Sequence, residues 1–107
     1  MPRLDDNGTT VTLDLHGATV DDALGLVLRT AALAARRGRA TLRVVHGSST
    51  SDALARNHTI KHALHDLLDD GDLPDAQGDV RFEGETLISL PLASSSSPSP
   101  IRLLDVR

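Results

Sequence analysis

Three side chains that can move protons or hold cations lie in two His-Gly segments of this chain. Asp14 and His16 belong to the segment LDLHG at residues 13–17, and His46 belongs to VVHG at residues 44–47. An imidazole can transfer protons near neutral pH, and a carboxylate can orient an imidazole or bind a divalent cation. This set suits cleavage of a phosphodiester bond. The alternative is that the Asp and His of the first segment only cap a helix or fix a turn.

The residues around both segments predict the elements that position these side chains. Apolar and polar residues alternate over residues 11–16, which predicts a strand covered on one face. Residues 17–38 have the apolar spacing of a helix with Thr19 as its N-cap, and residues 40–46 predict a second strand. A strand–helix–strand unit is a right-handed crossover that makes its two strands parallel. The two His-Gly pairs should therefore be neighbours beyond the ends of the strands, where open α/β sheets bind ligands.

The turn after each strand is predicted to bind an anion such as a phosphate. Gly17 and Gly47 permit a sharp turn and close approach of the backbone, and the helix that follows begins with unpaired N–H groups. Ser48, Ser49 and Thr50 add hydroxyl donors to the second turn. No Gly-Lys-Ser/Thr sequence follows, so this is not a P-loop and ATP binding is not indicated.

The second half of the chain predicts one more helix and two more strands. An apolar stripe predicts a helix that begins near residues 50–52 and runs to about Asp70. Residues 79–92 predict two strands around a turn at Gly84. Residues 93–100 have the composition of a flexible linker. The last segment, residues 101–107, is compatible with a docked tail, a pairing strand or disorder.

Three histidines share one face of the second predicted helix: His58, His62 and His65 stand at i, i+4 and i+7. That spacing can bind zinc or nickel. No Glu accompanies them as in His-Glu-x-x-His, and no neighbouring side chain is placed to orient the rings. We therefore expect a solvent-exposed helix face, with an adventitious metal site as the alternative.

Composition excludes several classes of function. Phe82 is the single Phe, Tyr or Trp residue, so we do not expect the protein to recognise bases by stacking them on Trp or Tyr platforms. The absence of cysteine excludes disulfides, thiolate metal sites and a Cys nucleophile. The N-terminal residues lack the apolar core of a signal peptide. Arg29 interrupts the longest apolar stretch, which is too short to cross a membrane. We expect a soluble cytoplasmic protein without a membrane partner.

Charge is unevenly distributed along a chain whose formal net charge is −4. Residues 23–51 contain no acidic residue, and their arginines are Arg29, Arg36, Arg37, Arg39 and Arg43. Residues 66–79 contain six Asp and no basic residue. Arg39 and Arg43 are candidates for contacts with a phosphate backbone, and the alternative is two ordinary solvated faces.

Both His-Gly segments resemble motifs of the Small MutS-Related (Smr) domain family. The family's opening motif is similar to LDLHGATVDDAL at residues 13–24. Its second motif, a strand ending in His-Gly or Thr-Gly followed by any residue and Gly, matches LRVVHGSST through Gly47 and has Ser49 at the second glycine. The closing strand pair is similar to FEGETLISLPL, so the resemblance covers about residues 10–92.

The resemblance implies a two-layer α/β sandwich similar to the C-terminal domain of translation initiation factor three. Its four-stranded mixed sheet would carry two helices on one face, in the order β-α-β-α-β-β. We expect residues 1–9 to form an N-terminal tail, residues 10–92 the Smr-like domain, and residues 93–107 a Ser/Pro-rich linker and C-terminal tail.

The resemblance also implies nucleic-acid binding and, in some members, endonuclease activity on DNA or RNA, with functional positions at Asp14, His16, His46 and Gly47. The leading hypothesis is a stand-alone domain that binds structured nucleic acid and nicks it. Asp14 would orient His16 or help hold Mg²⁺, His16 would be the general acid or base, and His46 with the loop amides would position the phosphate. The alternative is a non-catalytic module that binds a partner protein, itself or nucleic acid.

Overall fold

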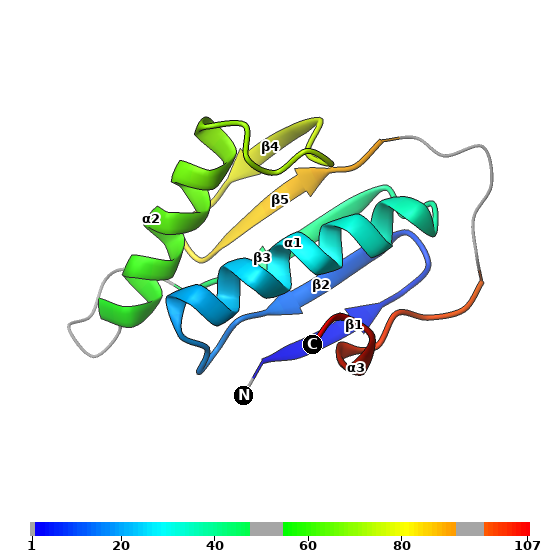
Figure 1. The fold of residues 1–107 in the computed structure, drawn as a ribbon, viewed down its shortest axis with the longest axis horizontal. Coiled ribbons are helices and arrows are strands. Elements are labelled where there is room, and N and C mark those ends of the chain that lie inside the picture. The colour runs from blue at the N-terminus through cyan, green and yellow to red at the C-terminus, as the bar shows by residue number, and fades with distance from the viewer. Residues whose placement is uncertain (1, 48–54, 92–97) are drawn as a thin grey trace.

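The computed structural model describes residues 2–47, 55–91 and 98–107, and for residues 55–59 it describes the backbone alone. These residues form a mixed sheet of five strands in the order β1-β2-β3-β5-β4, together with three helices (Figure 1). The strands are β1 (Arg3–Asp6), β2 (Thr10–Asp14), β3 (Thr41–Val45), β4 (Gly78–Arg81) and β5 (Glu85–Ser89). The helices are α1 (Val20–Arg36), α2 (Ala55–Asp69) and α3 (Leu103–Val106).

The predicted crossover between the two His-Gly pairs is confirmed. β2 and β3 pair in parallel, with Asp14 opposite Val45. The connecting helix α1 begins after Thr19, whose Oγ1 accepts a hydrogen bond from the backbone N–H of Asp22 at 3.2 Å. Figure 1 shows the carboxyl ends of β2 and β3 and the start of α1 at the same end of the sheet.

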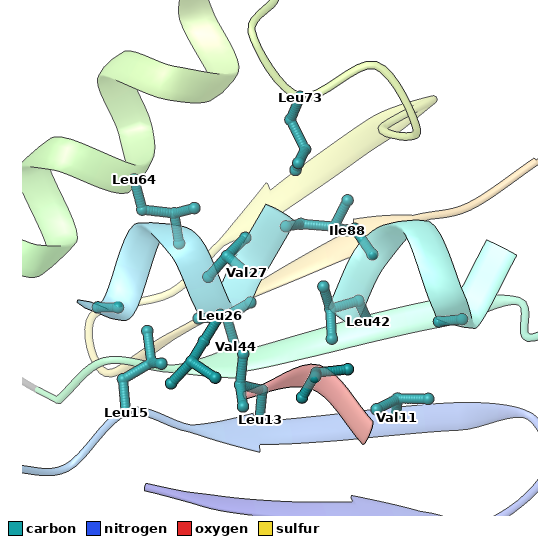
Figure 2. Close-up of a cluster of buried hydrophobic side chains, with 14 of the residues drawn as sticks. Val11, Leu13, Leu15, Leu26, Val27, Leu42, Val44, Leu64, Leu73 and Ile88 are labelled. Carbon is teal, nitrogen blue, oxygen red and sulfur yellow. The ribbon is translucent and has the colours of Figure 1, made fainter. Parts of the chain in front are cut away.

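The core between the sheet and the helices is wholly aliphatic (Figure 2). Side chains of alternate strand residues point into it, including Val11, Leu13, Leu42, Val44 and Ile88, each with an exposed fraction of 0%. Burying one such side chain contributes about 1.5–3 kcal/mol. The alternation seen in the sequence therefore identifies the covered face of the sheet correctly.

α2 lies beside α1 on the same side of the sheet and adds Ile60 and Leu64 to the core. It ends before Gly71, whose φ of 72° lies in the left-handed region that favours glycine. The predicted start of this helix, near residues 50–52, lies outside the described residues. Within the described part of the chain, no helix is long and apolar enough to cross a membrane.

The prediction of a four-stranded sheet is wrong because part of the predicted N-terminal tail forms β1. This strand runs antiparallel to β2, with Leu4 opposite Leu13 and packed against the core. Leu4 is the one apolar residue among residues 3–6, so the sequence carried no alternation from which the strand could be predicted.

The C-terminal segment, residues 98–107, is docked, which was one of the possibilities that the sequence left open. Ile101 and Val106 are buried, and α3 contacts α1. Backbone carbonyl groups of the segment accept hydrogen bonds from Arg29, Arg37 and Arg39. Three arginines of the basic stretch therefore hold the chain's own C-terminal segment.

Arg39 forms a buried ion pair with Asp6 and is only 1% exposed. Its Nε and Nη2 donate to the two carboxylate oxygens at 2.8 and 2.9 Å, and the backbone N–H of Ile101 donates to the same carboxylate at 2.7 Å. Burial would raise the pKa of Asp6, but the hydrogen bonds from Arg39, Ile101 and Gly8 outweigh it and hold that pKa below its ordinary value. Arg39 is thus not available to a phosphate, and its assignment to a nucleic-acid site is corrected.

Replacing Asp6 by Ala is expected to lower the free energy of unfolding by about 3–5 kcal/mol, because the charge of Arg39 stays buried without its partner. Denaturant unfolding at pH 7 measures the change. The matched control is Asp5→Ala, which removes an exposed carboxylate from the same strand and should change stability by less than about 0.5 kcal/mol. Equal losses in the two variants would contradict a structural role for the buried pair.

Replacing Thr30 of α1 by Val is expected to raise the free energy of unfolding by about 1 kcal/mol. The Thr30 hydroxyl is buried and has no hydrogen-bond partner in the described structure, so its removal at nearly constant shape relieves an uncompensated polar group. Thermal unfolding would be compared with that of Thr9→Val, which makes the same change at an exposed position. Destabilisation of the Thr30 variant alone would show that its hydroxyl is satisfied.

Candidate functional site at the ends of the parallel strands

A cavity of about 180 Å³ lies where the two His-Gly turns meet. Its lining residues are Asp14, His16, Val45, His46 and Gly47. The parallel pairing continues into the first turn, because the backbone N–H of Leu15 donates to the carbonyl of Val45 at 2.9 Å. The prediction that the two pairs are neighbours beyond the carboxyl ends of the strands is confirmed.

Asp14 shapes the first turn and still faces the cavity. Its Oδ1 accepts a hydrogen bond from the backbone N–H of His16 at 2.9 Å, and Gly17 follows with a φ of 85°. The carboxylate thus fixes the turn, and it bonds to the backbone of His16 rather than to the imidazole. No other hydrogen bond of the Asp14 carboxylate or of the exposed His16 ring occurs within the described residues. One carboxylate oxygen and one imidazole are therefore available for chemistry.

The second turn is held by β5 and its preceding loop. The backbone N–H groups of His46 and Gly47 both donate to the carbonyl of Gly84, at 3.1 and 2.9 Å, and Gly47 has a φ of 86°. The Gly47 amide is therefore already hydrogen-bonded and does not point at a ligand. The predicted phosphate contacts of Ser48, Ser49 and Thr50 lie outside the described residues.

His46 is buried, with 2% of its surface exposed, and both ring nitrogens have partners inside the protein. Nδ1 lies 3.0 Å from the carbonyl oxygen of Gly47, and Nε2 lies 3.0 Å from Oγ1 of Thr86. Neither ring nitrogen is thus left without a partner inside the protein, and this placement favours a structural role for the His46 ring. The catalytic role of His46 stays a prediction.

The prediction that the α2 histidines form a solvent-exposed face is wrong for His65. Its Nε2 lies 3.2 Å from Oγ1 of Thr86, and its ring meets the edge of the His46 ring with the centroids 5.8 Å apart. His62 is exposed as expected, and the side chain of His58 lies outside the described structure. Residues 2–47, 60–91 and 98–107 contain no group of three His, Cys, Asp or Glu side chains that could hold a metal ion.

Sequence reasoning missed His65, Thr86 and Gly84 as neighbours of the second turn. All three lie far along the sequence from the second His-Gly segment. Their contacts with it depend on how α2 and β5 pack against the end of β3. In the structure β5 pairs with β3 and Thr86 lies opposite Val44, a pairing that the sequence did not predict. The spacing of the histidines alone gave no signal for this contact.

Arg43 is the basic residue of the predicted set that lies on the sheet near the cavity. It stands two residues before Val45, and hence on the same face of the sheet as Val45 and the paired Asp14. Its half-exposed guanidinium forms an ion pair with Glu85. Exposed pairs of this kind contribute little to stability, so a phosphate can compete with the carboxylate for Arg43.

Burial lowers the pKa of both internal histidines. For His46, desolvation is the main cause, with Lys61 adding to it while the Gly47 carbonyl and Glu85 oppose it. For His65, desolvation again comes first, and the positive charges of Arg81 and Lys61 add to it while Asp69 opposes it. The lowered pKa favours the neutral form of both imidazoles.

This architecture defines an α/β protein with a cavity beyond the ends of two adjacent parallel strands. The family model for the Smr domain matches residues 13–80, well over half of the chain, and the chain belongs to this family. No curated protein and no solved structure shows a significant match to the chain. The similarity to the C-terminal domain of translation initiation factor three stays a prediction.

Stability is expected to fall as the pH drops below about 6.5, the ordinary pKa of histidine. Burial lowers the pKa of His46 and His65 in the folded protein. At pH values between these lowered pKa values and about 6.5, the unfolded chain therefore binds more protons than the folded protein, and a falling pH favours unfolding. Denaturant unfolding at pH 7.5 and 5.5 measures the loss of stability. Both pH values lie above the ordinary pKa values of carboxylates, so the histidines dominate the difference. His65→Gln should reduce it, whereas His62→Gln, at an exposed position, should not; an unchanged pH dependence in His65→Gln would contradict the assignment.

Proposed function

We propose that this Smr domain binds structured DNA or RNA at the cavity between its two His-Gly turns and hydrolyses a phosphodiester bond there. The observation that carries the proposal is the convergence of Asp14 and His16 on a cavity at the ends of parallel strands. Membership of the Smr family, which is associated with nucleic-acid binding and nicking, supports the choice of substrate.

The two available side chains suit general acid–base chemistry. The exposed His16 imidazole can take a proton from an attacking water or give one to the leaving oxygen. Asp14 keeps His16 in place through its backbone N–H, and the free carboxylate oxygen can receive a proton at the same cavity. The turn at Gly17 allows a nucleic-acid backbone to approach, because glycine places no side chain in its path.

The described lining of the cavity offers few oxygen ligands for Mg²⁺. Among the described residues that line it, Asp14 is the one carboxylate. Mg²⁺ is commonly bound through one or two carboxylates together with substrate phosphates, so Asp14 would be its ligand from this chain. When bound, the ion would neutralise charge on the phosphate.

The charge distribution favours approach of a polyanion from the cavity end. Arg43 is exposed on the sheet close to Asp14 and Val45. The acidic residues after Asp66 gather around the C-terminal end of α2, whose length of about 22 Å separates them from the cavity end of the helix. Asp69 is also partly neutralised by its ion pair with Arg81. Nucleic acid can therefore bind despite a net charge of −4.

Asp14→Asn and His16→Gln are each expected to lower the rate of cleavage by about 100-fold or more while binding is retained. Asn keeps an oxygen that can accept the His16 N–H, so the turn should survive in the first variant. Labelled duplex, branched DNA and single-stranded RNA would be incubated with each protein in Mg²⁺ or EDTA.

The matched control for these variants is His62→Gln, which changes an exposed histidine on α2. It should cleave and bind like the unchanged protein. Binding should weaken steeply as salt is added, because it releases counterions from the phosphate backbone. Cleavage that persists equally in Asp14→Asn and His16→Gln would reveal a contaminating nuclease and remove the catalytic part of the proposal.

A non-catalytic nucleic-acid-binding or protein-binding module on the same fold is the second candidate. The engaged ring nitrogens of His46 and the engaged N–H of Gly47 favour it, because they leave the cavity with two reactive side chains. Tight binding without cleavage by the unchanged protein would identify a nucleic-acid module. Deleting the C-terminal residues is no test of a protein partner, since Ile101 and Val106 belong to the core.

A further inference from the structure

A chain of hydrogen bonds joins three elements behind the second His-Gly turn. It runs from His65 of α2 through Thr86 of β5 to His46 at the end of β3, with distances of 3.2 Å and 3.0 Å to the Thr86 hydroxyl. Thr86 is fully buried, and the His46 ring continues the chain to the carbonyl of Gly47 at 3.0 Å. The chain therefore ends on a residue that lines the cavity.

Hydrogen-bonding capacity fixes the direction of every bond in this chain. A carbonyl oxygen can only accept, so Nδ1 of His46 carries the hydrogen that bonds to Gly47. Nε2 of the neutral ring is then an acceptor, and the single hydroxyl hydrogen of Thr86 must point at it. The Thr86 oxygen has lone pairs left for His65, whose Nε2 must donate. One tautomer of each histidine is compatible with the whole chain.

The surroundings keep both rings in these neutral tautomers. Desolvation dominates at both sites, and the charged groups that face them are Lys61 and Asp69 of α2, Arg81 of β4 and Glu85 of β5. A proton added to Nε2 of His46 would remove the acceptor of the Thr86 hydroxyl. The Thr86 hydroxyl would then have to donate to Nε2 of His65 instead, which requires the other tautomer of His65.

Both backbone polar groups of Gly47 are consequently engaged in hydrogen bonds. Its N–H donates to the carbonyl of Gly84, and its carbonyl accepts from His46. Its φ of 86° lies in the left-handed region, and these two hydrogen bonds hold the turn in that conformation. The hydrogen bonds that join His65, Thr86 and His46 therefore help to hold this part of the cavity wall in position.

We infer that His65 and Thr86 are positioning residues of the nucleic-acid site, acting through the His46 ring to hold the Gly47 turn at the cavity wall. The inference rests on the proposed function for the identity of the ligand. The hydrogen-bond chain itself can be tested without one.

Thr86→Val and Thr86→Ser provide the matched test, because the first removes the hydroxyl at nearly constant shape and the second keeps it. In the unchanged protein and in Thr86→Ser, ¹⁵N spectra of the imidazoles should show His46 protonated at Nδ1 and His65 protonated at Nε2. In Thr86→Val, His65 should revert to a rapidly exchanging tautomer mixture, and the amide resonance of Gly47 should move. Imidazole and Gly47 signals that stay unchanged in Thr86→Val would overturn the inference.

Binding of labelled duplex and branched DNA and of single-stranded RNA supplies the second readout. Thr86→Val should weaken binding about 2- to 10-fold, the loss expected from one neutral hydrogen bond, and Thr86→Ser should bind like the unchanged protein. Unchanged affinity in Thr86→Val with altered imidazole spectra would overturn the link to the site. If the unchanged protein binds no nucleic acid, the proposed function fails, while the spectra still decide whether the chain holds the turn.

A second pair of variants keeps the test decisive if Thr86→Val does not fold. His65→Leu removes the donor at the start of the chain, and His65→Gln keeps an N–H at a comparable position. The His46 Nδ1–H should exchange faster with water in His65→Leu than in His65→Gln. Equal exchange in the two variants would contradict a role for His65 in holding His46.

Discussion

The parallel pairing of β2 with β3 is the constraint on which the site depends. Two strands joined by one helix must run in the same direction, so the segments after both strands emerge at the same end of the sheet. The register then places Asp14 opposite Val45, one residue before His46. Neither His-Gly turn forms the cavity by itself, because its lining comes from both. The aliphatic packing of α1 against these strands, seen in Figure 2, maintains this arrangement.

The two halves of the cavity have different chemical characters. The first turn presents an exposed imidazole and a carboxylate of which one oxygen has no hydrogen-bond partner among the described residues. The second turn has its ring nitrogens and its Gly47 amide engaged within the protein, so it shapes the wall. Similar motifs therefore differ in how far their side chains are exposed, and the difference arises from burial.

The arginines of residues 23–51 have a structural role that their charge alone did not indicate. Arg29, Arg37 and Arg39 donate to carbonyl groups of the C-terminal segment, and Arg39 also pairs with Asp6 at the end of β1. Guanidinium groups suit this role because they can donate several hydrogen bonds in fixed directions. The sheet edge and the C-terminal segment are consequently joined through the buried pair of Arg39 and Asp6, whereas Arg43 pairs with Glu85 on the exposed face of the sheet.

The sequence by itself determined the β2–α1–β3 crossover, the covered face of the sheet, the neighbouring His-Gly turns and the family, because these follow from local periodicity and short motifs. It did not determine β1, which has a single apolar residue, or the docking of the C-terminal segment. Nor could it show that His46 is buried or that His65 reaches Thr86. Only the tertiary structure decided these points, since each depends on the packing of residues distant in sequence, and packing sets whether a polar group meets solvent or an internal partner.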